Sequence, residues 1–96
     1  MHDLPSGLEI RRPSNLSPGL AAAWDEVAPQ VLPTIGAAGL EALATVVLRL
    51  RDARRRIDDD GVLVAGDRGQ PGAHPALAIE RDAIAEIRAW MSAFGR

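Results

Sequence analysis

Histidines and clustered aspartates are the side chains of this sequence that could bind a metal ion or transfer a proton. The two histidines, His2 and His74, lie far apart in the chain, and no cysteine is present. Zinc sites in proteins are built mostly from several histidines and cysteines, so no metal site is predicted around His74. We interpret His74 as a turn residue that precedes a helix-opening proline, Pro75.

The acidic residues 58–60, followed by Gly61, are similar to the first residues of a calcium-binding loop. Such a loop needs further oxygen ligands and a closing glutamate. The later positions hold Val62, Val64 and Gly69 instead, which offer no such side chains. We therefore predict that the acidic residues form a solvated helix end.

Nucleophilic and phosphate-transfer chemistry lack the necessary residue patterns. Ser92 has no histidine at helical spacing, and most other serines lie near the N-terminus. No glycine is followed by the lysine and the serine or threonine of a phosphate-binding loop. The sequence predicts a protein that is not an enzyme and has no cofactor and no small-molecule substrate.

The basic side chains are all arginines, and one short stretch holds Arg49, Arg51, Arg54, Arg55 and Arg56. On a helix, Arg49 and Arg56 would point away from the apolar side, while Arg51 and Arg55 would lie along one flank. The flank could contact DNA phosphates. Alternatively, Arg54, Arg55 and Arg56 could pair with the aspartates at 58–60, four residues further along, although arginine before aspartate is the less favourable order on a helix. Because the formal net charge is -2, any DNA contact must come from a local patch.

Arg54 differs from the other arginines because it falls within the apolar stripe of the expected helix. A charge at such a position is costly unless a carboxylate pairs with it. We predict Glu80 or Glu86 as that partner, in this chain or in another copy.

Helix-start and helix-stop residues divide the chain into an N-terminal arm and a domain. Residues 1–17 keep no helical or strand period and are predicted to be a flexible arm, so the domain spans 18–96. Ser17 and Pro18 are typical of a helix start, and Pro29 should end or kink that first helix. Residues 33–39 mix proline, glycine and alanine and are predicted to be a turn. The apolar spacing from Leu40 onward predicts the clearest helix, which Gly61 should end.

The second half of the chain contains a short extended element and a further helix. Residues 62–64 are rich in β-branched side chains, and residues 66–69 favour a tight turn, so a small β-hairpin is expected there. His74 and Pro75 then open the last helix. The predicted fold is mainly α, a three-helix domain with a small β-hairpin between the second and third helices.

The helical faces predict self-association. Alanine supplies much of the apolar content of this 96-residue chain, so one copy can bury only a thin core. The last helix has a broader apolar face than a monomer's surface helix requires. The expected oligomer interface consists of Leu43, Val47, Leu50, Arg54, Ile84, Ile87, Trp90, Met91 and Phe94.

No apolar run approaches the length needed to span a bilayer, and the N-terminus lacks the order of a signal peptide. The sequence therefore predicts a soluble cytoplasmic protein without a membrane partner.

Three stretches resemble one family of phage terminase small subunits. The first is W-x-x-V-A-P-x-V-L, which begins at Trp24. The second is the arginine-rich helix ending in D-G-V-L-V, and the third runs from G-A-H-P-A-L to W-M-S-A-F-G-R. In that family a leucine, threonine and proline run commonly follows the last glycine, whereas here Arg96 follows Gly95 directly.

The resemblance implies a non-catalytic DNA-packaging component that forms a ring, binds double-stranded viral DNA and regulates the terminase large subunit. In a phage-infected cell it would act in the host cytoplasm. The residues expected to face DNA are Arg11, Arg12, Arg49, Arg51, Arg55 and Arg56. The alternative is a phage or host regulatory module that presents its helices to another protein and does not contact DNA.

Overall fold

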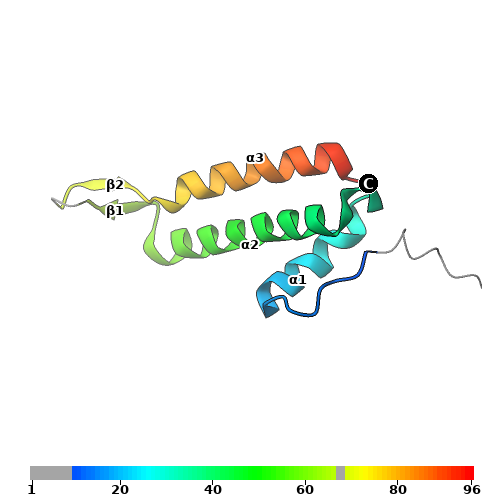
Figure 1. Cartoon of the computed structure of the whole chain (residues 1–96). Helices are drawn as coiled ribbons and strands as arrows, with labels where there is room; N and C mark the ends of the chain where they lie inside the picture. Colours follow the sequence, from blue (N-terminus) through cyan, green and yellow to red (C-terminus); the bar gives the residue numbers. More distant parts are fainter. Residues whose placement is uncertain (1–9, 67–68) are drawn as a thin grey trace, which may run out of the picture.

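A computed structural model describes residues 10–66 and 69–96 of the chain (Figure 1). The elements are α1 (Pro18–Val27), the 3-10 turns η2 (Ala28–Gln30) and η3 (Pro33–Ile35), α2 (Gly36–Asp60), β1 (Leu63–Ala65), β2 (Pro71–Ala73) and α3 (Ala76–Phe94). Helices dominate, and the two strands pair between α2 and α3. The predicted three-helix fold with a small hairpin is confirmed.

α1 begins and ends at the residues that the sequence indicates. The Ser17 hydroxyl accepts a hydrogen bond from the amide of Leu20 at 3.3 Å, and Pro18 occupies the first helical position, where its missing N–H costs nothing. The α-helix ends at Val27, and the segment with Pro29 continues only as a 3-10 turn. Proline cannot donate the hydrogen bond that would extend the helix.

α2 begins at Gly36, four positions before the expected Leu40. The alanines at 37 and 38 favour helix, so only η3 serves as the turn that was expected over 33–39. At the other end, Gly61 has a φ of 82° and its amide donates to the Ile57 carbonyl at 2.7 Å. This confirms the predicted glycine stop, because a positive φ is costly for residues with a side chain.

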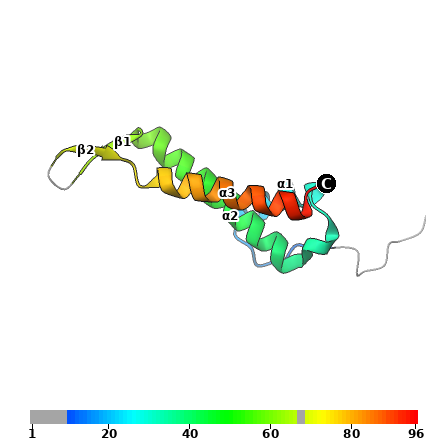
Figure 2. The same ribbon diagram turned by 90° about the horizontal axis from the view of Figure 1, so that it is seen from above.

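The hairpin extends the antiparallel pair of long helices beyond their ends (Figures 1 and 2). β1 and β2 are antiparallel, with Leu63 opposite Ala73 and Ala65 opposite Pro71. The central residues of the expected turn, 67 and 68, lie outside the described residues. Because two short strands are not stable alone, the hairpin depends on its attachment to the helices.

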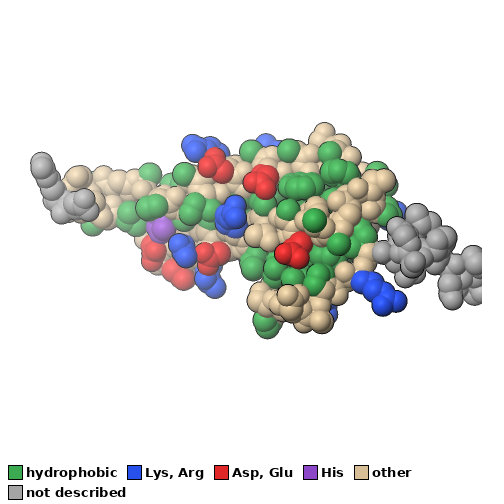
Figure 3. All heavy atoms as spheres, viewed as in Figure 1, with side chains coloured by type: hydrophobic (Ala, Val, Ile, Leu, Met, Phe, Trp, Pro, Cys, Tyr) green, Lys and Arg blue, Asp and Glu red, His purple; other side chains and the backbone are tan. Residues whose placement is uncertain are grey.

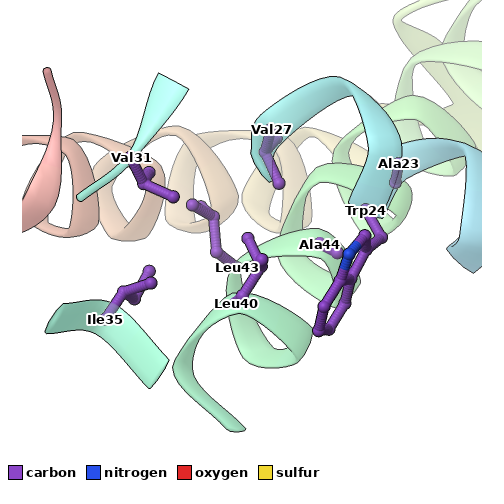
Figure 4. Close-up of a cluster of buried hydrophobic side chains, with 8 residues drawn as sticks. All are labelled: Ala23, Trp24, Val27, Val31, Ile35, Leu40, Leu43 and Ala44. Carbon is purple, nitrogen blue, oxygen red and sulfur yellow. The ribbon is translucent and has the colours of Figure 1, made fainter. Parts of the chain in front are cut away.

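The hydrophobic core lies at one end of the molecule, where α1, η3, the first half of α2 and the end of α3 meet (Figure 4). Leu40 and Leu43 are fully buried there, and Trp24 is nearly so. The chain after α3 returns to the core and forms an isolated bridge between Val31 and Gly95. The Leu32 amide donates to the Phe94 carbonyl at 2.7 Å, which fixes the end of α3 against the α1–α2 connection.

The other end of the molecule has only two helical layers. α1 has 10 residues and α2 has 25, so their lengths are about 15 and about 37 Å. In Figure 1, α1 lies along the first part of α2 and leaves the part next to the hairpin uncovered. Among the described residues of that part, the buried hydrophobic side chains are Ala53, Ala76 and Ala83.

The N-terminal segment next to α1 contacts the domain. Ile10 and Leu16 are partly buried and pack against the core. The Arg12 guanidinium forms an ion pair with Asp25 on α1. Residues 1–9 of the expected arm lie outside the described residues.

Contrary to the expectation that no apolar run is long enough to span a bilayer, the segment Pro33–Asp60 is long and apolar enough to do so by length and composition. Its apolar residues pack against α1 and α3, and Leu40, Leu43, Ala44 and Val46 are buried. The core helix of a soluble protein can have the same length and apolar composition, so the segment does not indicate a membrane protein.

Candidate functional site

The outer side of α2 carries a shallow hollow of about 600 Å³. It is lined by Thr45, Leu48, Arg49, Arg51, Asp52 and Arg55. The hollow is therefore lined by three of the arginines expected to bind DNA. Arg51 and Arg55 are four residues apart and share one helix face, and Arg49 lies three residues before Asp52 at the edge of that face. Arg56 is exposed on the same helix but does not line the hollow, and Arg11 and Arg12 lie on the N-terminal segment.

Arg51 is held by Glu26 of α1 in a two-point ion pair. Arg51 Nη1 donates to Glu26 Oε1 at 3.1 Å, and Nη2 donates to Oε2. The hydrogen bonds from Arg51 lower the pKa of Glu26, and the same contact raises the pKa of Arg51. Glu26 is therefore ionised, and the pair intact, at neutral pH. Nothing in the sequence pointed to this contact, since it depends on how α1 packs on α2.

Arg55 and Arg56 share a single carboxylate, that of Asp52. Arg55 Nη2 contacts Asp52 Oδ1, and Arg56 Nε lies 3.1 Å from Oδ2. The interpretation that the aspartates at 58–60 neutralise these arginines is therefore wrong, because the carboxylate that pairs with Arg55 and Arg56 is that of Asp52. Asp52 precedes the arginines by three and four positions, which is the favourable order relative to the helix dipole. That spacing was visible in the sequence.

Arg54 pairs with Glu80 of α3, with 3.2 Å between Nε and Oε2. This confirms one of the two predicted partners. The Arg54 side chain remains 54% exposed, so the charge lies at the rim of the α2–α3 contact. A pair in that position contributes little to stability, about 1 kcal/mol at most.

His74 is buried and hydrogen-bonded on both ring nitrogens. Its Nδ1 accepts from the amide of Ala76, the first residue of α3, at 2.9 Å, and Nε2 lies 2.8 Å from Asp60 Oδ2 at the end of α2. These partners assign the neutral tautomer with its proton on Nε2. Figure 3 shows the acidic and histidine side chains gathered where the helices meet the hairpin. His74 lies in the turn before α3, as the sequence interpretation had it. Its side chain also links the end of α2 to the start of α3.

Replacing His74 with alanine should lower the free energy of unfolding by about 2 kcal/mol, because the Ala76 amide of α3 and the Asp60 carboxylate of α2 both lose their hydrogen-bond partner. Asparagine can place an acceptor near the Nδ1 position, so His74→Asn should lose less. Chemical denaturation followed by circular dichroism measures both values. Equal losses for the two variants would contradict the capping role of Nδ1.

The face formed by all three helices carries a groove of about 270 Å³. It is lined by Glu26, Val27, Gln30, Leu43, Val47, Leu50, Arg51, Arg54, Ile87 and Met91. Figure 3 shows hydrophobic side chains along the middle of the molecule, with charged ones interspersed. The groove therefore combines an apolar floor with a charged rim.

Most residues of the expected oligomer interface are accessible. Val47, Leu50, Ile84, Ile87, Trp90, Met91 and Phe94 are half-buried, and Arg54 is exposed. Leu43 is different, because none of its surface is exposed and it belongs to the chain's own core. The period of α2 identified Leu43 as apolar and inward-facing but could not tell which helix would cover it.

Within residues 10–66 and 69–96, no three histidine or acidic side chains are grouped closely enough to hold a metal ion. The fold and its surfaces define a small, mainly α-helical protein. It has an arginine-rich hollow on α2 and an apolar groove between α1, α2 and α3.

A family model described as phage terminase, small subunit, matches residues 21–95. The chain therefore belongs to the phage terminase small subunit family, as its sequence motifs indicated. Membership supports a role in DNA packaging in general, and small subunits of this family are generally non-catalytic. Searches of curated proteins and of solved structures gave no significant match.

Proposed function

We propose that this protein is a terminase small subunit that assembles into a ring, binds double-stranded viral DNA and regulates the terminase large subunit in the host cytoplasm. The family match supports the packaging role. The observation that supports DNA binding is the hollow on α2, which is lined by Arg49, Arg51 and Arg55.

The charge balance of the α2 surface favours phosphate contacts. Its arginines outnumber the carboxylates of Glu26 and Asp52, and Arg49 has no carboxylate within ion-pair distance among the described residues. Each phosphate contact adds salt-sensitive affinity through counterion release. A ring would present many copies of this modest surface to one DNA, so weak contacts add up. Arg56 and the N-terminal Arg11 and Arg12 complete the proposed DNA-facing set.

The two-layer half of the molecule supports assembly. Leu50 in the second half of α2 and Ile84 in the first half of α3 are half-buried. A third helical layer from a neighbouring copy would remove their remaining apolar surface from water. We propose that Val47, Leu50, Arg54, Ile84, Ile87, Trp90, Met91 and Phe94 contribute to the subunit interface.

DNA binding is tested by the double variant Arg51→Glu/Arg55→Glu, assayed by fluorescence anisotropy with a short DNA duplex at graded salt. The affinity should fall about tenfold or more, and the dependence of affinity on salt should become shallower. The control is Arg81→Glu/Arg88→Glu on α3, which changes the net charge equally. Loss of binding in both would indicate a general charge effect and contradict a site on α2.

The regulatory module without DNA contact has one observation in its favour. Arg51, Arg55 and Arg56 already have carboxylate partners within the chain. If the wild-type oligomer fails to bind duplex DNA even at low salt, this second function replaces the first.

A further inference from the structure

Two carboxylates lie within the arginine-rich surface of α2 and occupy the groups that a phosphate would contact. We propose that Glu26 and Asp52 act as built-in competitors of DNA phosphates and so set the affinity of each subunit for DNA. The inference rests on the proposed function and adds two residues that weaken binding.

Glu26 takes both terminal nitrogens of Arg51. The paired contacts, Nη1 to Oε1 at 3.1 Å and Nη2 to Oε2, form the two-point arrangement in which a guanidinium also binds a phosphate. Arg51 cannot offer this edge to DNA until Glu26 leaves it. Because Glu26 belongs to α1 and Arg51 to α2, the competitor is placed by tertiary packing.

Asp52 engages two arginines at once. Its Oδ1 contacts Arg55 Nη2 and its Oδ2 lies 3.1 Å from Arg56 Nε. A single carboxylate therefore occupies donors on two of the proposed DNA-binding side chains. In the hollow, Glu26 occupies Arg51 and Asp52 occupies Arg55. Arg49 has no carboxylate partner among the described residues, so it can contact a phosphate without first releasing one.

The pairs are weak enough to exchange. The Arg51 and Glu26 side chains are 48% and 53% exposed, so water screens their attraction. Exposed ion pairs of this kind contribute little to stability. DNA can displace the carboxylates, but each exchange subtracts from the affinity of a single subunit. Tight binding then depends on many subunits acting together, so a single unassembled subunit binds DNA only weakly.

The test is the double variant Glu26→Gln/Asp52→Asn, measured against a short duplex of mixed sequence at graded salt. Glutamine and asparagine keep the side-chain shape but bind arginine less strongly than carboxylates do. We expect binding about fivefold tighter than wild type. Asp52→Asn alone should give part of this gain, and it cannot undock α1 because its partners lie within α2.

The matched control is Glu41→Gln/Glu86→Gln, which changes the net charge equally. Both glutamates are exposed, and neither has an arginine within ion-pair distance among the described residues. The control should bind DNA with an affinity close to that of wild type. An equal gain in both double variants would overturn the inference, because charge alone would then explain it.

The remaining outcomes separate the inference from the proposed function. If Arg51→Glu/Arg55→Glu loses binding while Glu26→Gln/Asp52→Asn matches wild type, the arginines bind DNA and the competition is refuted. If neither wild type nor Glu26→Gln/Asp52→Asn binds duplex DNA, both proposals fall.

Discussion

Replacing Leu43 with alanine should lower the free energy of unfolding by about 3 to 5 kcal/mol. Leu43 has no exposed surface and packs in the cluster that joins α1, α2 and the residues around Val31. Removing its branched end leaves a cavity that a core built largely from short side chains cannot refill. Urea denaturation followed by circular dichroism measures the loss.

The control for this substitution is Leu32→Ala, which makes the same chemical change at a side chain that is 40% exposed. It should cost about 1 kcal/mol or less, since exposed apolar groups lose little transfer free energy. If Leu43→Ala instead left the unfolding free energy unchanged and only reduced assembly, Leu43 would be an interface residue, as the sequence suggested.

Introducing a charge at Ile84 should dissociate the oligomer. Ile84 is half-buried in the half of α3 that follows the hairpin, where we propose that a neighbouring copy supplies a third helical layer. In the assembly, Ile84→Glu would bury an unpaired carboxylate at every contact, at a cost of several kcal/mol per subunit. Sedimentation velocity should show the mass of the assembly fall to that of a single chain.

The control is Ala85→Glu, which adds the same charge at the next residue. Ala85 is exposed on α3, about 100° around the helix from Ile84, so it should leave the assembly intact. Circular dichroism melting of both variants checks that the monomer fold survives. An undiminished mass for Ile84→Glu would remove this face from the proposed interface.

Local sequence signals predicted the elements of the fold well, because their causes lie within a few residues. The Ser17 cap, the proline after α1, and the stop at Gly61 all act through the neighbouring backbone. The start of α2 was predicted four residues late. There, helix-favouring alanines outweighed the glycines that the turn prediction relied on.

Tertiary contacts were predictable only where a local rule constrained them. Arg54 was expected to need a carboxylate because it lies in an apolar stripe, and it pairs with Glu80. The partner of Arg51 could not be inferred, since Glu26 is brought there by the packing of α1 on α2. The pairing of Asp52 with Arg55 could have been found from its three-residue spacing.

The most direct test of the account is the mass of the wild-type protein in solution, measured by native mass spectrometry over a range of concentrations. The two-layer half of the chain and its open apolar groove predict a closed oligomer of defined subunit number. A folded single chain that persists at the highest concentration would contradict the proposed assembly, and with it the multivalent binding of DNA.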